Sequence, residues 1–211
     1  RDRYGVLAIV IIGILGIPAS SFIAVLSAAG LTIGLAFQGS LSNFAGGVLI
    51  LLFKPFKIGD FVKEDVHGNE GLVEGIDLFY TRMRTFDNKI VIIPNGSLAN
   101  TSITNYTANN KRRIEIKVGI SYDSDMKRAK DILMNVINSQ DGILKNEDNK
   151  VYVDALEESQ ITIGTMAWVM TDDYWKIKWE LTEKFKNALD DAGIEIPFNQ
   201  LSVTINEKQR K

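Results

Sequence analysis

The chain begins with an uncharged apolar part and continues into a longer part that carries nearly all of its charges. From Tyr4 to Phe53 there is no Asp, Glu, Lys or Arg residue, and the first charged residues after this segment are Lys54 and Lys57. A helix needs about 20 apolar residues to cross the hydrocarbon core of a bilayer. The pattern therefore predicts that the N-terminal part of the chain lies in or along a membrane.

Pro18 divides the apolar part into two helices. The apolar run before it is too short to span a bilayer by itself, and the chain begins with Arg rather than Met. We therefore expect residues 1–17 to be the end of a membrane helix that starts further upstream. A cleaved signal peptide is the alternative, but a polar mature domain would then follow, whereas a second apolar segment follows here.

Residues 18–54 are expected to form the next membrane helix, with an interruption. Phe22 to Phe53 as one straight helix would extend about 48 Å, whereas the hydrocarbon core measures about 30 Å. Gln38-Gly39 is the expected break and Gly46-Gly47 a second weak point, because glycine destabilises a helix interior. The helix after the break carries serine and asparagine side chains and is expected to lie along the membrane interface.

The basic residues at the two ends of the apolar part indicate its orientation. Lys54 and Lys57 follow it, and Arg1 and Arg3 precede it. Because Lys and Arg are enriched on the cytoplasmic side of membranes, both ends are expected there. The chain is thus predicted to belong to a multi-pass membrane protein with a cytoplasmic C-terminal region.

The small residues of the second helix form two seams. On a helical wheel at about 100° per residue, a ridge of Leu31 and Leu35 is flanked on both sides. One seam contains Ala24, Ala28 and Thr32, and the other contains Ser27, Gly30 and Gly34. A helix in a ring of identical copies touches a neighbour on each flank, and small residues allow close approach. The pattern suits such a ring with the leucines facing its axis, although a membrane helix that is merely rich in small residues remains an alternative.

The rest of the chain predicts two soluble domains. Over residues 55–107, five short β-branched runs separated by turns predict a small β-barrel or sandwich, with strands at 60–63, 71–76, 79–85, 89–93 and 102–106. Residues 108–198 show the order β-α-β-β-α of an α+β ferredoxin-like domain, with helices at 123–139 and 172–192. Residues 199–211 contain one alternating strand, Leu201–Asn206, which has no partner in its own chain and is expected to pair with another copy.

Composition excludes several kinds of site. The chain has no Cys and one His, so disulfides, thiolate metal sites and multi-histidine metal centres are excluded, and we expect no metal, no cofactor and no catalytic residues. His67 is interpreted as a turn residue. Asp123, Asp125, Asp172 and Asp173 are interpreted as helix caps and first-turn acids. Trp175 and Trp179, four residues apart on a helix, are expected to pack in the core.

Three segments closely resemble the bacterial small-conductance mechanosensitive channel family, the MscS family. They are AVLSAAGLTIGLAFQGSLSNFAGGVLILLF at Ala24–Phe53, KPFKIGDFV at Lys54–Val62 and IPNG at Ile93–Gly96. The resemblance implies a homoheptamer in the bacterial inner membrane. It also implies that the channel opens under membrane tension and releases ions and small osmolytes on hypoosmotic shock, with weak selectivity. Its partners would be its own copies, membrane lipid and permeating solutes.

The resemblance also implies roles for individual residues. Leu31 and Leu35 would constrict the pore, Ala24 and Ala28 would act as knobs, Gly30 and Gly34 as grooves, and Gln38-Gly39 as the helix break. The β domain would be Sm-like, and the terminal strands of seven subunits would close a parallel β-barrel. Ser27, Thr32 and the Gly46-Gly47 pair depart from the commonest family residues, which puts helix sliding and the stiffness of the second helix segment in question.

Two other functions fit parts of the pattern. One is a scaffold or secretion ring of similar architecture, and the other is a membrane-tethered Sm-like protein that binds RNA. The basic cluster Lys111–Arg113 has no interleaved aromatic residues, and the net charge of the chain is -2, which argues against nucleic acid as a partner. Pressure-activated currents are expected only of a channel.

Overall fold

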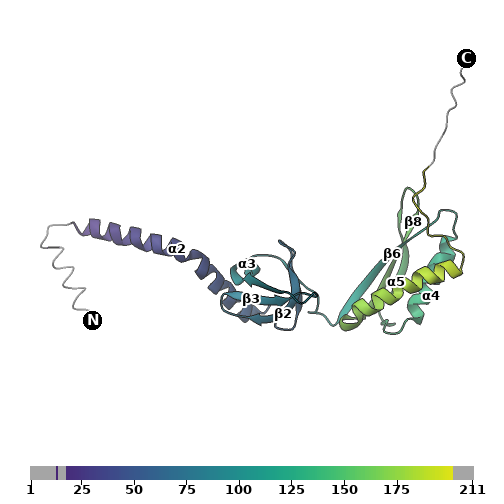
Figure 1. Cartoon of the computed structure of the whole chain (residues 1–211), viewed down its shortest axis with the longest axis horizontal. Coiled ribbons are helices and arrows are strands. Elements are labelled where there is room, and N and C mark those ends of the chain that lie inside the picture. Colours follow the sequence, from purple (N-terminus) through teal and green to yellow (C-terminus); the bar gives the residue numbers. More distant parts are fainter. Residues whose placement is uncertain (1–12, 14–17, 202–211) are drawn as a thin grey trace, which may run out of the picture. The chain divides into compact units, whose positions relative to one another are not determined.

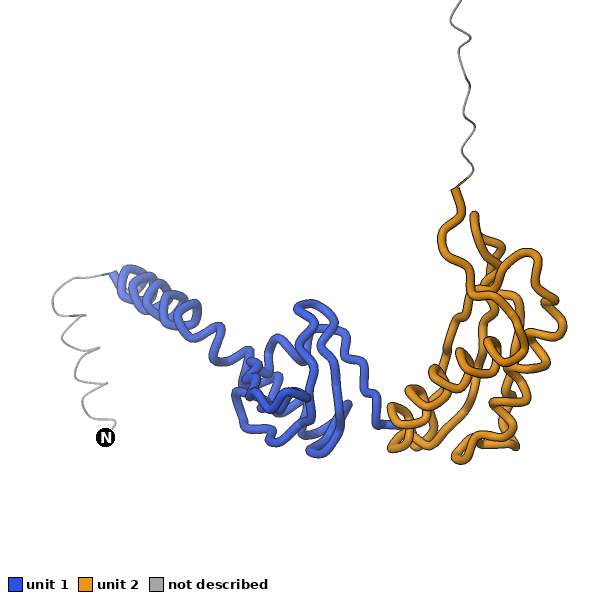
Figure 2. Tube along the Cα trace, turned by 45° about the vertical axis from the view of Figure 1, so that its right-hand side comes forward, with its two compact units in different colours: residues 1–108 blue, residues 109–211 orange. Residues whose placement is uncertain are grey.

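The computed structural model describes residue 13 and residues 18–201, except the side chain of Ala19. The chain folds as two compact units, whose boundary falls between Ala108 and Asn109 (Figure 2). The first unit contains the long apolar helix and a small β domain, and the second is an α+β domain.

One continuous helix, α2, extends over Ala19–Phe53. The predicted interruption of the helix at Gln38-Gly39 is wrong, because both residues are helical. The ribbon nevertheless changes direction part-way along its length (Figure 1). Glycine lowers the stability of a helix by about 1 kcal/mol relative to alanine, which permits a bend without enforcing an interruption. The helix ends where Lys54 adopts the left-handed conformation, with φ 49°, and its N–H bonds to the carbonyl of Ile50.

A single antiparallel sheet forms the β domain. Its strands are β1 Phe61–Glu64, β2 Glu70–Ile76, β3 Tyr80–Arg84, β4 Ile90–Pro94 and β5 Ile103–Asn105, in the order β4-β3-β2-β1-β5. All five predicted strands are confirmed, with ends that differ by one residue or less. The sandwich alternative is wrong because the described strands form one sheet. A short helix, α3 Asn95–Ala99, joins β4 to β5.

The core of the β domain includes a residue of α2. Its buried apolar side chains are Ile50, Phe56, Val62, Val73, Met83, Ile93 and Leu98. Ile50 belongs to the last turn of α2, and Phe56 lies just beyond the helix. The end of α2 is therefore part of the β domain and not a linker to it.

The second unit has the predicted β-α-β-β-α order. It consists of β6 Lys111–Ile120, α4 Met126–Ser139, β7 Lys150–Leu156, β8 Ile161–Met170, a 3-10 turn at Thr171–Asp173 and α5 Tyr174–Asp191. The sheet order is β6-β8-β7, so β8 lies between two strands that are both antiparallel to it. Leu133 of α4 and Leu181 of α5 are buried in the same core as Ile163 of β8.

Helix capping in this unit follows the prediction at one helix only. Asp125 caps α4, where its side chain accepts a hydrogen bond of 3.0 Å from the N–H of Arg128. At α5, Asp173 precedes the helix but its side chain makes no capping bond, so the predicted side-chain cap is wrong. Asp172 and Asp173 do lie in the first turn of the preceding 3-10 helix, as predicted for first-turn acids. The 3-10 turn leads the chain into α5 instead, and Gly193, with φ 69°, follows its end as predicted.

The expected core position of Trp175 and Trp179 is wrong. Their side chains are 43% and 65% exposed, and their ring centroids lie 5.9 Å apart on the outer side of α5. The buried face of α5 consists of Ile177, Leu181, Phe185 and Leu189. A spacing of four places two residues on one face of a helix but does not decide which face is buried.

The predicted terminal strand Leu201–Asn206 falls largely outside the described residues. Leu201 is described and exposed. Just before it, the N–H of Gln200 donates a 3.1 Å hydrogen bond to the hydroxyl of Ser159.

Candidate functional site

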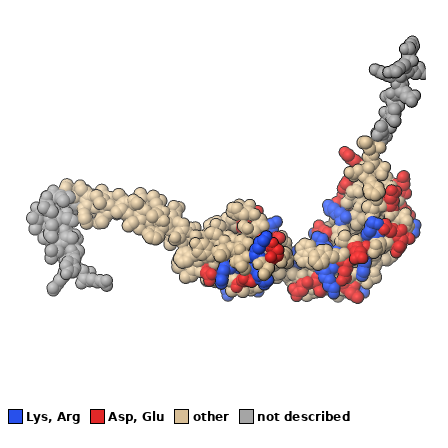
Figure 3. Space-filling model, in the orientation of Figure 1, with Lys and Arg blue, Asp and Glu red and all other residues tan. Residues whose placement is uncertain are grey.

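Among the described residues, α2 is the one helix that is long and apolar enough to cross a membrane. Its candidate span is Ser20–Phe53, 34 residues, and the most apolar stretch of this span has a mean hydropathy of 1.9 and is not buried within the chain. Figure 3 shows this helix without charged side chains along its visible surface. An uncharged helix that its own chain does not cover needs lipid or other helices around it.

The two leucines predicted to constrict the pore are free of contacts that would bury them. Leu31 is 64% exposed and Leu35 is 62% exposed. They lie four residues apart and therefore on the same face of α2. This face of the single chain is open to contact with other copies. The single chain does not by itself define the axis of a ring of copies.

The predicted packing residues Ala24, Ser27, Ala28, Gly30, Thr32 and Gly34 are all exposed. A Cβ atom added at Gly30 or Gly34 would meet no atom within 4 Å, so nothing in the chain itself requires glycine there. The hydroxyl of Thr32 donates a 2.8 Å hydrogen bond to the carbonyl of Ala28, and its polar group is therefore satisfied inside the helix. The surface remains suited to close approach by another helix.

Gly46 and Gly47 have a packing role instead of the predicted role as a weak point. Both residues are helical and buried. A Cβ atom at Gly46 would lie 2.5 Å from the carbonyl oxygen of Asn95, and one at Gly47 would lie 2.1 Å from the carbonyl oxygen of Leu78. Neither distance accommodates a side chain, so the two glycines allow α2 to lie directly against the backbone of the β domain.

Asn95 holds together the surface on which α2 rests. Its side chain is fully buried. The hydroxyl of Thr81 donates a 2.7 Å hydrogen bond to Oδ1, and Nδ2 donates a 2.7 Å hydrogen bond to the carbonyl of Asp77. One amide thus joins α3 to β3 and to the loop before β3, and its Nδ2 would lie 2.7 Å from a Cβ at Gly47.

A direct hydrogen bond joins α2 to α3 at the same place. Oδ1 of Asn43 accepts a 2.9 Å hydrogen bond from the N–H of Gly96. A Cβ atom at Gly96 would lie 2.8 Å from that same oxygen. Sequence reasoning missed both Asn43 and Asn95 as structural residues, although the segment Ile93–Gly96 was part of the resemblance.

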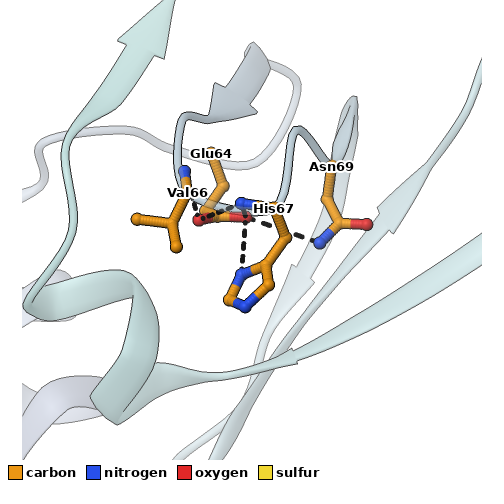
Figure 4. Close-up of polar contacts among 4 residues, drawn as sticks. All are labelled: Glu64, Val66, His67 and Asn69. Atoms are coloured by element: carbon orange, nitrogen blue, oxygen red, sulfur yellow. Dashed lines mark hydrogen bonds and ion pairs between the residues drawn. The ribbon is translucent and has the colours of Figure 1, made fainter.

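The turn between β1 and β2 is organised by a buried carboxylate (Figure 4). The Glu64 side chain is 2% exposed, and its Oε1 accepts hydrogen bonds from the N–H groups of Val66, at 2.7 Å, and His67, at 3.0 Å. Nδ1 of His67 lies 3.3 Å from Oε2. His67 is therefore a turn residue, as predicted.

The pKa of Glu64 lies below its ordinary value of 4.5. Burial by itself would raise this pKa, but hydrogen bonds from the backbone of His67 and Val66, with the charge of His67, outweigh that effect. The carboxylate is thus held in its ionised form as an acceptor for the turn.

Two family models match successive parts of the chain. The model described as "Mechanosensitive ion channel, beta-domain" matches residues 39–108, and the model described as "Mechanosensitive ion channel MscS, C-terminal" matches residues 114–196. The chain belongs to the MscS family of mechanosensitive channels. The family identified from the sequence segments is thereby confirmed, and the long apolar helix is consistent with a family of membrane channels.

Individual relatives support the same assignment. A small-conductance mechanosensitive channel of Edwardsiella ictaluri is 43% identical over 204 residues, which cover 95% of this chain and 71% of the relative. The crystal structure of Helicobacter pylori MscS in its closed state matches with a TM-score of 0.87 and 34% identity, over 95% of this chain and 79% of that one. The structure of the Arabidopsis thaliana protein MSL1 matches with a TM-score of 0.74 and 19% identity, over 94% of this chain and 75% of that one, and it shares the fold.

We predict that the MscS-family chain is sensitive to a methyl group at Gly47 and tolerant of one at Gly39. Gly47→Ala should lower the free energy of unfolding by about 1–3 kcal/mol, because the new atom overlaps backbone. Gly39→Ala is the matched control, since no atom lies within 4 Å of its Cβ position, and it should stabilise the helix by about 0.5–1 kcal/mol. Thermal unfolding of the purified protein measures both, and equal effects would contradict the docking role of Gly47.

We also predict that Glu64 contributes to acid sensitivity. Because its pKa is lowered in the folded state, its contribution is complete above pH 4.5 and is lost as the pH falls through the folded pKa. Glu64→Gln should lower the unfolding temperature at neutral pH, and the difference from the wild type should shrink in acid. Glu70→Gln, at the exposed first residue of β2, should change little. A destabilisation by Glu64→Gln that stays constant with pH would refute the prediction.

Proposed function

We propose that copies of this chain assemble as a homoheptamer around a pore that membrane tension opens, so that ions and small osmolytes leave the cell on hypoosmotic shock. The observation that supports this most strongly is the exposed, uncharged surface of α2, with its leucine ridge between two seams of small residues. One helix cannot enclose a path for ions. Several copies are needed, and a helix with a different seam on each flank suits a closed ring.

In the proposed closed state, Leu31 and Leu35 of all copies form two apolar rings. Water is unfavourable inside a narrow apolar constriction, so ions lose the hydration that they need to pass. Tension does work in proportion to the in-plane area that the protein gains, and it therefore favours a wider ring. The seams allow neighbouring helices to slide during this change, since small side chains offer few steric obstacles.

The contact of α2 with the β domain determines which part of the helix can move when the channel opens. Gly47 lies against the backbone of Leu78, and Asn43 is bonded to Gly96. The last turns of α2 are thus held by the β domain, and a bend in the helix before them lets the pore-lining part tilt while the end stays fixed. In this view Gln38-Gly39 is the position of the bend, within a helix that remains continuous.

The soluble part completes the proposed assembly. We place it on the cytoplasmic side of the bacterial inner membrane, because Lys54 and Lys57 follow the membrane helix. The segment 201–206 would form a parallel β-barrel with the same segment of the other copies, and each strand would hydrogen-bond to two neighbours. Ions would then enter through openings between subunits near residues 106–113, where any charge selection would act.

Replacing Leu35 by Ser should hydrate the constriction. The expected result is conduction at lower tension than in the wild type, with slower growth of cells that express the variant. Leu26→Ser is the matched control, because Leu26 is also exposed but lies on the opposite face of α2. Recording from excised membrane patches measures the threshold, and an unchanged threshold in Leu35→Ser would show that this residue does not line the pore.

Replacing Gly34 by Leu should obstruct sliding between helices and raise the opening tension. Ala29→Leu adds a side chain of the same size on the face opposite Leu31, where no neighbouring pore helix is proposed, and should leave the threshold near that of the wild type. Both variants are compared by patch recording at matched expression. A rise of equal size in both would count against the proposed seam.

A further inference from the structure

A surface at the end of α2 combines exposed apolar residues with cations. Its residues are Leu52, Phe53, Lys54, Lys57 and Ile58, which we call the helix-end patch. The three apolar side chains are 69%, 73% and 63% exposed, respectively, and both lysines are exposed. Large apolar side chains that remain exposed in this number, beside charges, are typical of an interaction surface.

The patch is held in place by the β domain. Phe56, between the two lysines, is buried in the core of that domain. The carboxylate of Asp60, itself buried, accepts a 3.0 Å hydrogen bond from the backbone N–H of Lys57 and a 2.8 Å hydrogen bond from Nδ2 of Asn105. The backbone of the patch is thus fixed by contacts that do not involve either lysine side chain.

The two lysine side chains of the patch are exposed cations. In the part of the chain that the structure describes, no carboxylate forms a salt bridge with Lys54 or Lys57. Asp60 is near in sequence, but its carboxylate accepts hydrogen bonds from the backbone of Lys57 and the amide of Asn105. The two lysines are three residues apart, so their Cα atoms lie within about 11 Å of each other.

The membrane helix brings this patch to the level of the lipid headgroups. A span of 34 residues is about 51 Å long at 1.5 Å per residue, whereas the hydrocarbon core measures about 30 Å. An upright, straight helix would carry Phe53 past the headgroups, but the change of direction in α2 shortens its reach across the bilayer (Figure 1). The helix remains apolar to its last residue, and Leu51, Leu52 and Phe53 are exposed, which an end surrounded by water would not favour.

We propose that the helix-end patch binds anionic phospholipid at the membrane surface where α2 ends. Lys54 and Lys57 would contact the phosphates, and Leu52, Phe53 and Ile58 would contact the upper part of the acyl chains. Lipid accounts for both the cations and the apolar residues, because one lipid molecule presents a negative headgroup beside hydrocarbon. An acidic protein segment would account for the cations alone.

Lipid retained by the purified full channel tests this inference. The protein is reconstituted in equimolar phosphatidylglycerol and phosphatidylcholine, extracted in detergent, and the retained lipids are counted by mass spectrometry. The wild type should retain phosphatidylglycerol in preference. The variant with both Lys54→Gln and Lys57→Gln should lose this preference, by about fivefold for each lysine.

Three controls make the outcome decisive. Lys54→Arg with Lys57→Arg keeps both charges and should keep the preference. Lys89→Gln removes an exposed cation elsewhere in the β domain and should also keep it. Phe53→Ser with Ile58→Ser should reduce the retention of both lipids together.

An unchanged preference in the double glutamine variant, with assembly intact by gel filtration, would overturn the proposal and assign the lysines to an acidic protein partner. An equal loss in Lys89→Gln would also overturn it. The inference depends on the membrane position of α2 but not on gating. A channel that retains phosphatidylglycerol but passes no current under tension would therefore contradict the proposed function and leave this inference standing.

Discussion

The contact of α2 with the β domain is the constraint on which the first unit depends. At Gly47 the helix comes so close to the carbonyl of Leu78 that a Cβ atom would lie 2.1 Å from it. The surface beneath is itself fixed by the buried amide of Asn95, which bonds to Thr81 and to the carbonyl of Asp77. Since a backbone surface cannot yield in the way that a flexible side chain can, the helix has one position on the domain.

The docked C-terminal end of α2 limits how the exposed part of the helix before it can move. The part of α2 before its docked end has no contacts that bury Leu31 or Leu35, so its conformation in a membrane depends on lipid and on other copies. A helix that is anchored at one end and free at the other can change its tilt with little disturbance of the soluble fold. The bend in α2 is a place where such a change could be accommodated, because glycine weakens the helix without ending it.

The fold was largely predictable because its signals are local. Runs of β-branched residues between turns predicted every strand of the β domain, and Asp125 was a cap that its own sequence position revealed. The prediction that Trp175 and Trp179 lie in the core was wrong because the buried face of α5 is determined by its packing against the sheet and α4, which are far away in sequence. The structural roles of Asn95 and Glu64 could not be predicted either, since the sequence does not show whether a polar residue near a turn is exposed or buried.

The glycines of α2 show most clearly what sequence alone cannot decide. Gly30 and Gly34 face open space in the single chain, whereas Gly46 and Gly47 lie against backbone. All four look alike in the sequence, as small residues in an apolar helix. The second pair is fixed by contacts within one chain, so its substitution acts on folding and is felt by an isolated subunit. If the proposed ring is right, the first pair acts only after copies meet, and its substitution would leave the fold of each subunit unchanged while altering how the subunits move against one another.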